Sequence, residues 1–135
     1  MSESSYVLVD TNVILDVTEQ DKTWSEWSEN QLSQYVNRLL INPLIYTELC
    51  YEAGGTADVD AVMIALGLHL EELPREALFL TSQAYKQYRQ RGGTKTAPLA
   101  DFFIGAHATA LEIPILTRDV TRYNTYFHDV RLITP

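Results

Sequence analysis

Short apolar runs alternate with helical patterns along most of the chain. The strand-like runs, rich in Val, Leu and Ile, are expected at residues 6–9, 39–41, 68–70, 112–116 and 130–133. Helical spacing of apolar positions predicts helices at residues 24–40, 43–53, 58–67, 74–91 and 98–111, with a further helix opening near Val13. This alternation predicts a parallel sheet with right-handed crossovers in a three-layer α/β/α arrangement. At 135 residues the chain suits a single domain over residues 1–135 and is too short for two.

Two strand-like runs from opposite halves of the chain end on a hydroxyl and an acid. The first run is followed by Asp10, Thr11 and Asn12, and the run at 112–116 is followed by Thr117, Arg118 and Asp119. Ligands of open α/β sheets collect at the carboxyl ends of the strands, so Asp10 and Asp119 are expected to converge there. The alternative is that Asp10 or Thr11 only caps the next helix, a position that both residue types favour.

Two predicted helices carry a carboxylate on an apolar face. Glu48 lies within the apolar stripe of Ile45 and Leu49, and Asp101 is the one acid of the helix at 98–111, which is apolar on nearly every side. A buried carboxylate requires a partner, a metal or a raised pKa. The alternatives are a Glu48 side chain that reaches solvent and an Asp101 that only stabilises the positive end of the helix dipole.

The four acids, Asp10, Glu48, Asp101 and Asp119, are therefore expected at one edge of the sheet. Four carboxylates held together repel one another and take up protons unless a cation neutralises them. Oxygen ligands favour Mg²⁺ or Mn²⁺ over zinc, and the sequence has no Cys/His cluster that would argue otherwise. Such ions activate water and stabilise an in-line displacement at phosphorus, so the acids predict phosphodiester hydrolysis.

The charge of the chain limits how it could bind nucleic acid. The formal net charge is −8, which disfavours non-specific attraction to phosphates, so a local patch or bound cations must supply positive charge. The only basic island contains Tyr85 and Tyr88 among its cations and is followed by two glycines. Its cations are Lys86, Arg89, Arg91 and Lys95, to which we add Arg118 as a candidate RNA contact. The alternative is a solvated helix end.

The remaining chemistry-bearing residues are expected to be structural. Cys50 is the only cysteine, so no internal disulfide exists, and we expect a small buried hydrophobe in a protein of a reducing compartment. His107 is expected to be a hydrogen-bonded core residue. The N-terminal residues lack a basic targeting segment, and the longest uncharged apolar window is far shorter than a bilayer span. We therefore expect a cytoplasmic protein.

Four motifs in this order resemble the PIN domain, especially ribonuclease toxins of the VapC type. They are Val9-Asp10-Thr11-Asn12, Tyr46-Thr47-Glu48-Leu49, the segment from Ala100 to Ala108 and Leu116-Thr117-Arg118-Asp119. The resemblance implies a five-stranded parallel sheet, a Mg²⁺- or Mn²⁺-dependent endoribonuclease, a homodimer and a small antitoxin that inserts into the active-site groove. It also implies that Asp10, Glu48, Asp101 and Asp119 bind the metal and that Thr11, Asn12 and Thr117 support them.

Two other functions compete with this interpretation. The first is a PIN-like module without turnover that binds RNA or a protein partner. The second is a phosphatase with Asp10 as nucleophile, which resembles haloacid-dehalogenase-like enzymes. Those enzymes carry a second acid two residues after the first, and Asn12 stands at that position here. The phosphatase is therefore the weaker alternative.

Overall fold

A five-stranded sheet forms the centre of the molecule in the computed structural model, which describes residues 5–96 and 98–135. The strands are β1 (Val7–Val9), β2 (Leu39–Ile41), β3 (Leu68–Leu70), β4 (Ile115–Leu116) and β5 (Leu132–Ile133). They lie in the order β3-β2-β1-β4-β5, and every neighbouring pair is parallel. The predicted parallel α/β fold is confirmed. The N-terminal residues 1–4, where no targeting segment is expected, lie outside the described residues.

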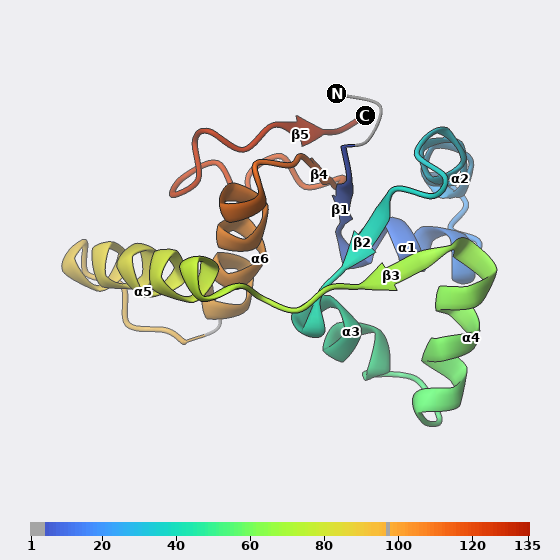
Figure 1. Cartoon of the computed structure of the whole chain (residues 1–135), viewed down its shortest axis with the longest axis horizontal. Coiled ribbons are helices and arrows are strands. Elements are labelled where there is room, and N and C mark those ends of the chain that lie inside the picture. The colour runs from blue at the N-terminus through green and yellow to red at the C-terminus, as the bar shows by residue number, and fades with distance from the viewer. Residues whose placement is uncertain (1–4, 97) are drawn as a thin grey trace.

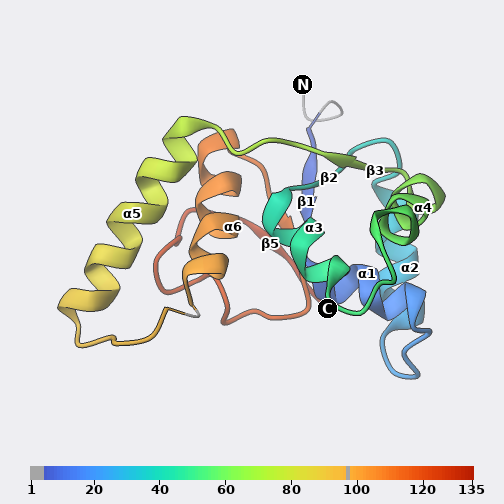
Figure 2. The same cartoon turned by 90° about the horizontal axis from the view of Figure 1, so that it is seen from below.

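Helices cover both faces of the sheet. They are α1 (Thr11–Thr18), α2 (Ser25–Gln34), α3 (Pro43–Cys50), α4 (Thr56–Leu66), α5 (Arg75–Gln90) and α6 (Pro98–Leu111). Figures 1 and 2 show α5 and α6 on one side of the strands and α1, α2 and α4 on the other. None of the helices in the described ranges has the length and apolar character needed to cross a membrane.

The predicted helix at 24–40 is shorter in the structure, because its last apolar residues belong to β2. The helix α2 ends at Gln34, and Asn37 adopts a left-handed conformation with φ of 70°. The Arg38 backbone N–H then donates to the Tyr35 carbonyl, which turns the chain into β2. Asn tolerates this conformation better than most residues, which explains why the reversal occurs here.

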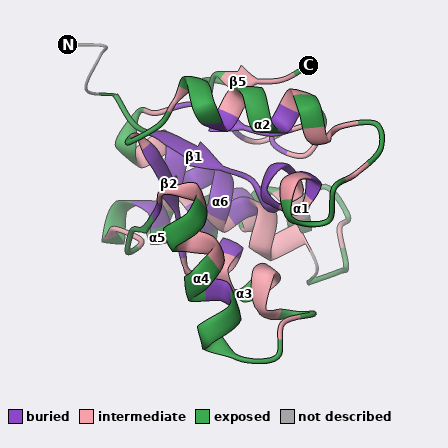
Figure 3. Cartoon of the chain, turned by 90° about the vertical axis from the view of Figure 1, so that its right-hand side faces the viewer, coloured by how far each residue is buried: buried purple, intermediate pink, exposed green. Residues whose placement is uncertain are grey.

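The strand β1 is buried along its whole length and lies between β2 and β4. Its residues Val7, Leu8 and Val9 are at most 2% exposed, and Figure 3 shows the strand at the centre of the buried region. Strands buried on both faces consist of continuous apolar runs, which is the pattern found here. The strand ends at Val9, and Asp10, itself fully buried, caps α1 by accepting from the Thr11 backbone N–H.

A buried hydrogen bond ties α3 to α6. Asn42 caps α3 by accepting from the Ile45 backbone N–H, and its amide lies 3.1 Å from His107 Nδ1. Both side chains are fully buried, and burial lowers the pKa of His107 to about 4, so the imidazole is neutral near neutral pH. His107 is therefore the hydrogen-bonded core residue expected from the sequence.

The segment after β4 is held against α6 by a close contact. The Phe127 ring lies so near Gly105 that a Cβ atom at this position would come within 2.4 Å of the ring. Only glycine allows this approach without a shift of the ring or the helix. The contact fixes residues 117–127 relative to α6, and this segment carries several groups of the site described next.

Candidate active site at the carboxyl edge of the sheet

Three of the predicted acids converge on one arginine that the sequence analysis did not single out. Each nitrogen of the Arg122 guanidinium contacts a different carboxylate. Nη1 lies 2.6 Å from Asp10 Oδ1, Nη2 lies 3.1 Å from Glu48 Oε2, and Nε lies 2.6 Å from Asp101 Oδ1. The three acids come from the end of β1, from α3 and from the first turn of α6, so the fold gathers them from distant parts of the chain.

Asp10 is the most completely satisfied of these acids. Its Oδ1 accepts from the Thr11 backbone N–H and from Arg122, and its Oδ2 accepts from the Thr117 hydroxyl at 2.7 Å and the Tyr123 hydroxyl at 3.0 Å. A charged group with no exposed surface is tolerated only with such compensation. Asp10 is thus both a helix cap and a member of the acid cluster, which resolves the alternatives considered for it.

The residues predicted to support the acids lie around them. The Thr11 hydroxyl donates to Glu48 Oε1. The Asn12 side-chain amide donates to Thr117 Oγ1 at 3.4 Å, and its oxygen accepts from the Arg118 backbone N–H at 3.2 Å. These contacts link the start of α1 to the end of β4. They also orient the hydroxyl of Thr117 toward Asp10.

Asp119 lies apart from the other three acids and is exposed. Its Oδ1 accepts from the Thr121 backbone N–H, the Thr121 hydroxyl and the Arg122 backbone N–H, at 2.9–3.1 Å. The carboxylate therefore fixes the backbone that carries Arg122, and it does not contact the guanidinium cluster. Its role as a metal ligand stays a prediction.

Burial and charge act together on the site. Burial raises the pKa of Asp101, an effect that the Arg122 guanidinium opposes and the charges of Asp10 and Glu48 reinforce. Burial works against the charge of Arg122, but the carboxylates outweigh it and raise the arginine pKa. Burial also raises the pKa of Tyr123, with the Asp10 charge adding to it, so the phenol keeps its proton and donates.

The donor set suits a hard divalent ion, although the arginine separates the donors. Within residues 5–96 and 98–135, no three acidic, histidine or cysteine side chains are grouped closely enough to hold a metal directly. The Arg122 guanidinium stands between Asp10, Glu48 and Asp101, so these carboxylates already surround a cation. Carboxylate oxygens are the ligands that Mg²⁺ and Mn²⁺ prefer, so the chemistry of these three donors suits such an ion.

A family match agrees with this geometry. The sequence model of the PIN domain family matches residues 7–127, which cover all the residues of the acid cluster. This chain belongs to the PIN domain family. The identification made from the four motifs is therefore confirmed.

Solved structures from toxin–antitoxin systems share the fold of this PIN domain. DNA-bound VapBC from Salmonella typhimurium matches with a TM-score of 0.72 and 18% identity, over 96% of this chain and 98% of that chain. A toxin–antitoxin complex from Klebsiella pneumoniae matches with a TM-score of 0.69 and 18% identity, over 96% and 97%. VapBC-1 from nontypeable Haemophilus influenzae matches with 0.69 and 15%, over 96% and 97%. The comparison with curated proteins found no match.

Beside the acid cluster, the PIN domain contains an ion pair that sequence reasoning missed. Asp16, 3% exposed, accepts from Arg118 Nε at 2.7 Å, from Arg118 Nη2 at 3.0 Å and from the Ser28 hydroxyl at 2.6 Å. The Arg118 guanidinium also lies over the Trp24 ring, 5.2 Å from its centroid. Arg118 thus has a structural role, and its predicted contact with RNA stays a prediction. An acid on the apolar face of α1 is the signal that identifies such a pair.

The basic island lies at the end of α5 and in the loop that follows. Lys86, Arg89 and Lys95 are exposed, and Arg91 lies over the Tyr126 ring at 5.1 Å. Tyr85 and Tyr88 are half-buried, pack against Phe102 and hydrogen bond to the Lys95 backbone. These tyrosines hold the loop in place, whereas the cations face solvent.

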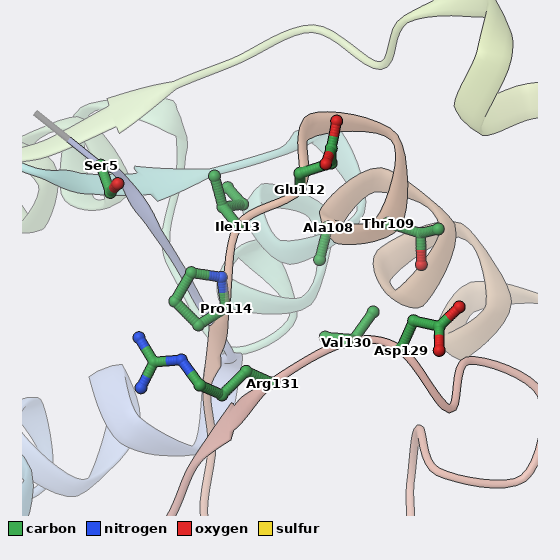
Figure 4. Close-up of a pocket in the computed structure, with 9 residues that line it drawn as sticks. All are labelled: Ser5, Ala108, Thr109, Glu112, Ile113, Pro114, Asp129, Val130 and Arg131. Atoms are coloured by element: carbon green, nitrogen blue, oxygen red, sulfur yellow. The ribbon is translucent and has the colours of Figure 1, made fainter. Parts of the chain in front are cut away.

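A separate cavity lies at the amino ends of the strands, opposite the carboxyl ends where the acids meet. It has a volume of about 500 Å³ and is lined by residues that precede β4 and β5, among them Glu112, Pro114 and Arg131 (Figure 4). Because these residues precede their strands, the cavity adjoins the amino ends of β4 and β5, away from the acids. The candidate site is therefore the acid cluster and not this hollow.

The Arg118–Asp16 pair gives a prediction for stability. Arg118→Met should lower the free energy of unfolding by roughly 2–4 kcal/mol, because the buried Asp16 carboxylate loses its cation. The control is Arg131→Met at an exposed position, which should change it by less than about 0.5 kcal/mol. Urea denaturation of both variants measures the difference. Equal effects at the two positions would show that the pair does not stabilise the fold.

Proposed function

We propose that this PIN domain is a metal-dependent endoribonuclease that hydrolyses RNA phosphodiester bonds in the cytoplasm. The observation that carries the proposal is the meeting of Asp10, Glu48 and Asp101, from three separate elements, around one cationic group. Three carboxylates in contact repel one another, and a bound cation offsets this cost. PIN-family membership and the fold shared with toxin–antitoxin structures support the same proposal.

Asp10, Glu48 and Asp101 would hold Mg²⁺ or Mn²⁺, with Asp119 as the fourth acid. An ion bound there supplies an activated water and stabilises negative charge on the phosphate. The oxygens available for it are those that now face Arg122. In the proposed metal-bound state these oxygens would turn from the guanidinium to the ion, which requires the three carboxylates to come closer together than they are around Arg122.

The polar neighbours orient these acids toward the centre. Thr117 and Tyr123 hold Asp10 Oδ2, and Thr11 holds Glu48 Oε1. Each of these two carboxylates thereby presents its other oxygen to the central cation. Asn12 adds a further constraint because it fixes the hydroxyl of Thr117.

The RNA would be bound by local positive charge in an otherwise acidic protein. We assign this contact to the basic island of Lys86, Arg89, Arg91 and Lys95, with Arg118 nearer the acids. The exposure of Lys86, Arg89 and Lys95 supports the assignment. Salt-dependent neutralisation of phosphates by such side chains is the usual source of affinity for nucleic acid.

We further propose that the protein is the toxin of a toxin–antitoxin pair, acting as a homodimer and inhibited by a small antitoxin. The matched structures include a toxin–antitoxin complex from Klebsiella pneumoniae and a member of the VapBC family of toxin–antitoxin systems from Mycobacterium tuberculosis. Large apolar side chains are exposed on this chain, among them Ile64 on α4 and Phe79 on α5, at 83% and 63%. Exposed apolar surface of this kind supports contacts with protein partners.

A second candidate function is a PIN module that binds RNA or protein without turnover. One observation favours it, namely that Arg122 contacts all three acids and so supplies them with a cation from the chain itself. The two candidates differ in whether the acids ever accept a divalent ion. Cleavage assays with purified protein separate them.

RNA cleavage should require the metal and the acids. Purified protein is expected to cleave RNA with Mg²⁺ or Mn²⁺ and not with chelator. Asp10→Asn and Asp101→Asn should each lower the rate at least about a hundredfold, more than the loss of a residue that only supports a ligand. Gel analysis of a structured RNA pool measures the rates, and circular dichroism verifies the fold.

The matched control is Asp129→Asn, which removes one charge from an exposed acid outside the cluster. Its cleavage rate should equal that of the wild type. Full activity in both Asp10→Asn and Asp101→Asn would eliminate the proposed site. RNA binding without cleavage in the wild type would favour the module without turnover.

Removing the charges of the basic island should weaken RNA binding. In a variant with Lys86, Arg89 and Arg91 all changed to Gln, the slope of log affinity against log salt should fall by up to about 2, because each lost phosphate contact contributes roughly 0.7. Filter binding with catalytically silent Asp101→Asn protein, across a salt series, measures the slope.

A charge-matched control separates local contacts from net charge. Changing the exposed Lys22, Arg75 and Arg131 to Gln alters the total charge equally but leaves the island intact. This variant should keep the wild-type salt slope. An equal loss in both variants would mean that the island has no specific role.

Toxicity should depend on the acids and be relieved by a partner. Expression of the chain in a bacterial host is expected to arrest growth, whereas the Asp101→Asn variant should not. Co-expression of a small open reading frame found next to the gene should restore growth. Normal growth of cells that accumulate active wild-type protein would show that the nuclease is not a toxin.

A further inference from the structure

We propose that Arg122 is a built-in cation that holds the acid cluster together in the metal-free protein and competes with a divalent ion for the same three acids. The proposal rests on the proposed function, since it assumes that the acids bind a metal. It starts from the three contacts of the guanidinium, each made by a different nitrogen to a different acid. No single acid is its partner, so the side chain occupies the position of a shared ion.

The charge balance explains why a divalent ion would displace the guanidinium. One positive charge among Asp10, Glu48 and Asp101 leaves the cluster two charges short of neutrality. A dication halves this deficit and attracts each oxygen more strongly, because Coulomb energy scales with the product of the charges. Asp10 and Glu48 stay oriented toward the centre when the guanidinium leaves, because each is held through its second oxygen by neutral donors.

The way in which Arg122 is attached allows its side chain to leave while its backbone stays. Asp119 accepts from the Arg122 backbone N–H, and the next residue, Tyr123, is 1% exposed and bonded to Asp10. The Arg122 side chain itself is 17% exposed, so it reaches the surface of the site. Withdrawal therefore involves rotation of a long side chain and no opening of the core.

Competition of this kind makes a distinct prediction for metal affinity. If the guanidinium occupies the acids in nine molecules of ten, the apparent affinity for the ion is lowered about tenfold. Arg122→Gln should therefore bind Mn²⁺ about tenfold or more tightly than the wild type, as measured by isothermal titration calorimetry without RNA. If Arg122 instead only positions the acids for the ion, the same variant should bind Mn²⁺ more weakly.

Two further variants control this measurement. Arg131→Gln makes the same charge change at an exposed position and should keep the wild-type Mn²⁺ affinity. Arg122→Lys keeps a charge but lacks the planar fork that reaches three acids, so its affinity should lie between wild type and Arg122→Gln. Equal affinities in the wild type, Arg122→Gln and Arg122→Lys would overturn the proposal.

Thermal denaturation tests the holding role of the arginine. In chelator, Arg122→Gln should melt below the wild type, because its three acids repel one another without a cation. Added Mn²⁺ should raise the melting temperature of Arg122→Gln more than that of the wild type. Equal increases in both proteins would contradict competition.

The wild-type protein provides a test that does not depend on a variant that folds. The Arg122 Nε–H, bonded to Asp101, should give a distinct arginine signal in a ¹⁵N-correlated NMR spectrum of the wild type, assigned through its side-chain correlations to the Arg122 backbone. Titration with diamagnetic Mg²⁺ should move this signal toward the position of a solvated arginine. A signal unchanged at saturating Mg²⁺ would overturn the proposal while leaving the metal site intact.

If neither the wild type nor Arg122→Gln binds Mn²⁺ or Mg²⁺, the metal site of the proposed function fails and this proposal fails with it.

Discussion

The buried carboxylate of Asp10 is the constraint on which the rest of the site depends. A charge without exposed surface must be compensated inside the protein, and its partners come from the start of α1, the end of β4 and residues 122–123. The strand order serves this requirement, because β4 lies directly beside β1 although more than a hundred residues separate them. Burial of the Asp10 carboxylate costs free energy, and the four hydrogen bonds that offset this cost hold the carboxylate in place. The hydrogen bonds that compensate the buried charge of Asp10 therefore also fix the geometry of the site.

The two helices that complete the cluster are held by a second buried polar contact. Asn42 caps α3, which carries Glu48, and His107 lies in α6, which carries Asp101. The side chains of Asn42 and His107 meet 3.1 Å apart. Because His107 is neutral near neutral pH, this link adds no charge to an already acidic region. This contact holds α3 and α6 together, and the charges on the two helices lie at Glu48 and Asp101. The uncharged Asn42–His107 contact supports the two helices, and the Arg122 side chain supplies the positive charge between their acids.

Much of the fold followed from apolar patterns, and much of the site followed from carboxylates that interrupt them. The strands at 39–41 and 68–70 and the helix at 98–111 have the expected bounds. The apolar run of Leu39, Leu40 and Ile41 marks the first, the leucines on either side of His69 mark the second, and Pro98 marks the start of the helix. Asp10, Glu48 and Asp101 meet at one edge of the sheet as expected, since each is an acid that interrupts an apolar pattern. Arg122 could not be found this way, because it lies in a loop without periodicity and its role depends on where the acids are in space. The Asp119 side chain binds neighbouring backbone N–H groups, a local choice that residue type alone does not determine.

The distance along the chain between Asp10 and Arg122 has a consequence for how the protein is made. Ribosomes add roughly 5–20 residues per second, so the 112 positions from Asp10 to Arg122 take about ten seconds to synthesise. During that interval β1 has emerged without its neighbour β4, and Asp10 has neither its arginine nor its tyrosine. The site can form only after nearly all the described chain has left the ribosome. The acid cluster of a nascent chain therefore stays incomplete until Arg122 and Tyr123 have emerged.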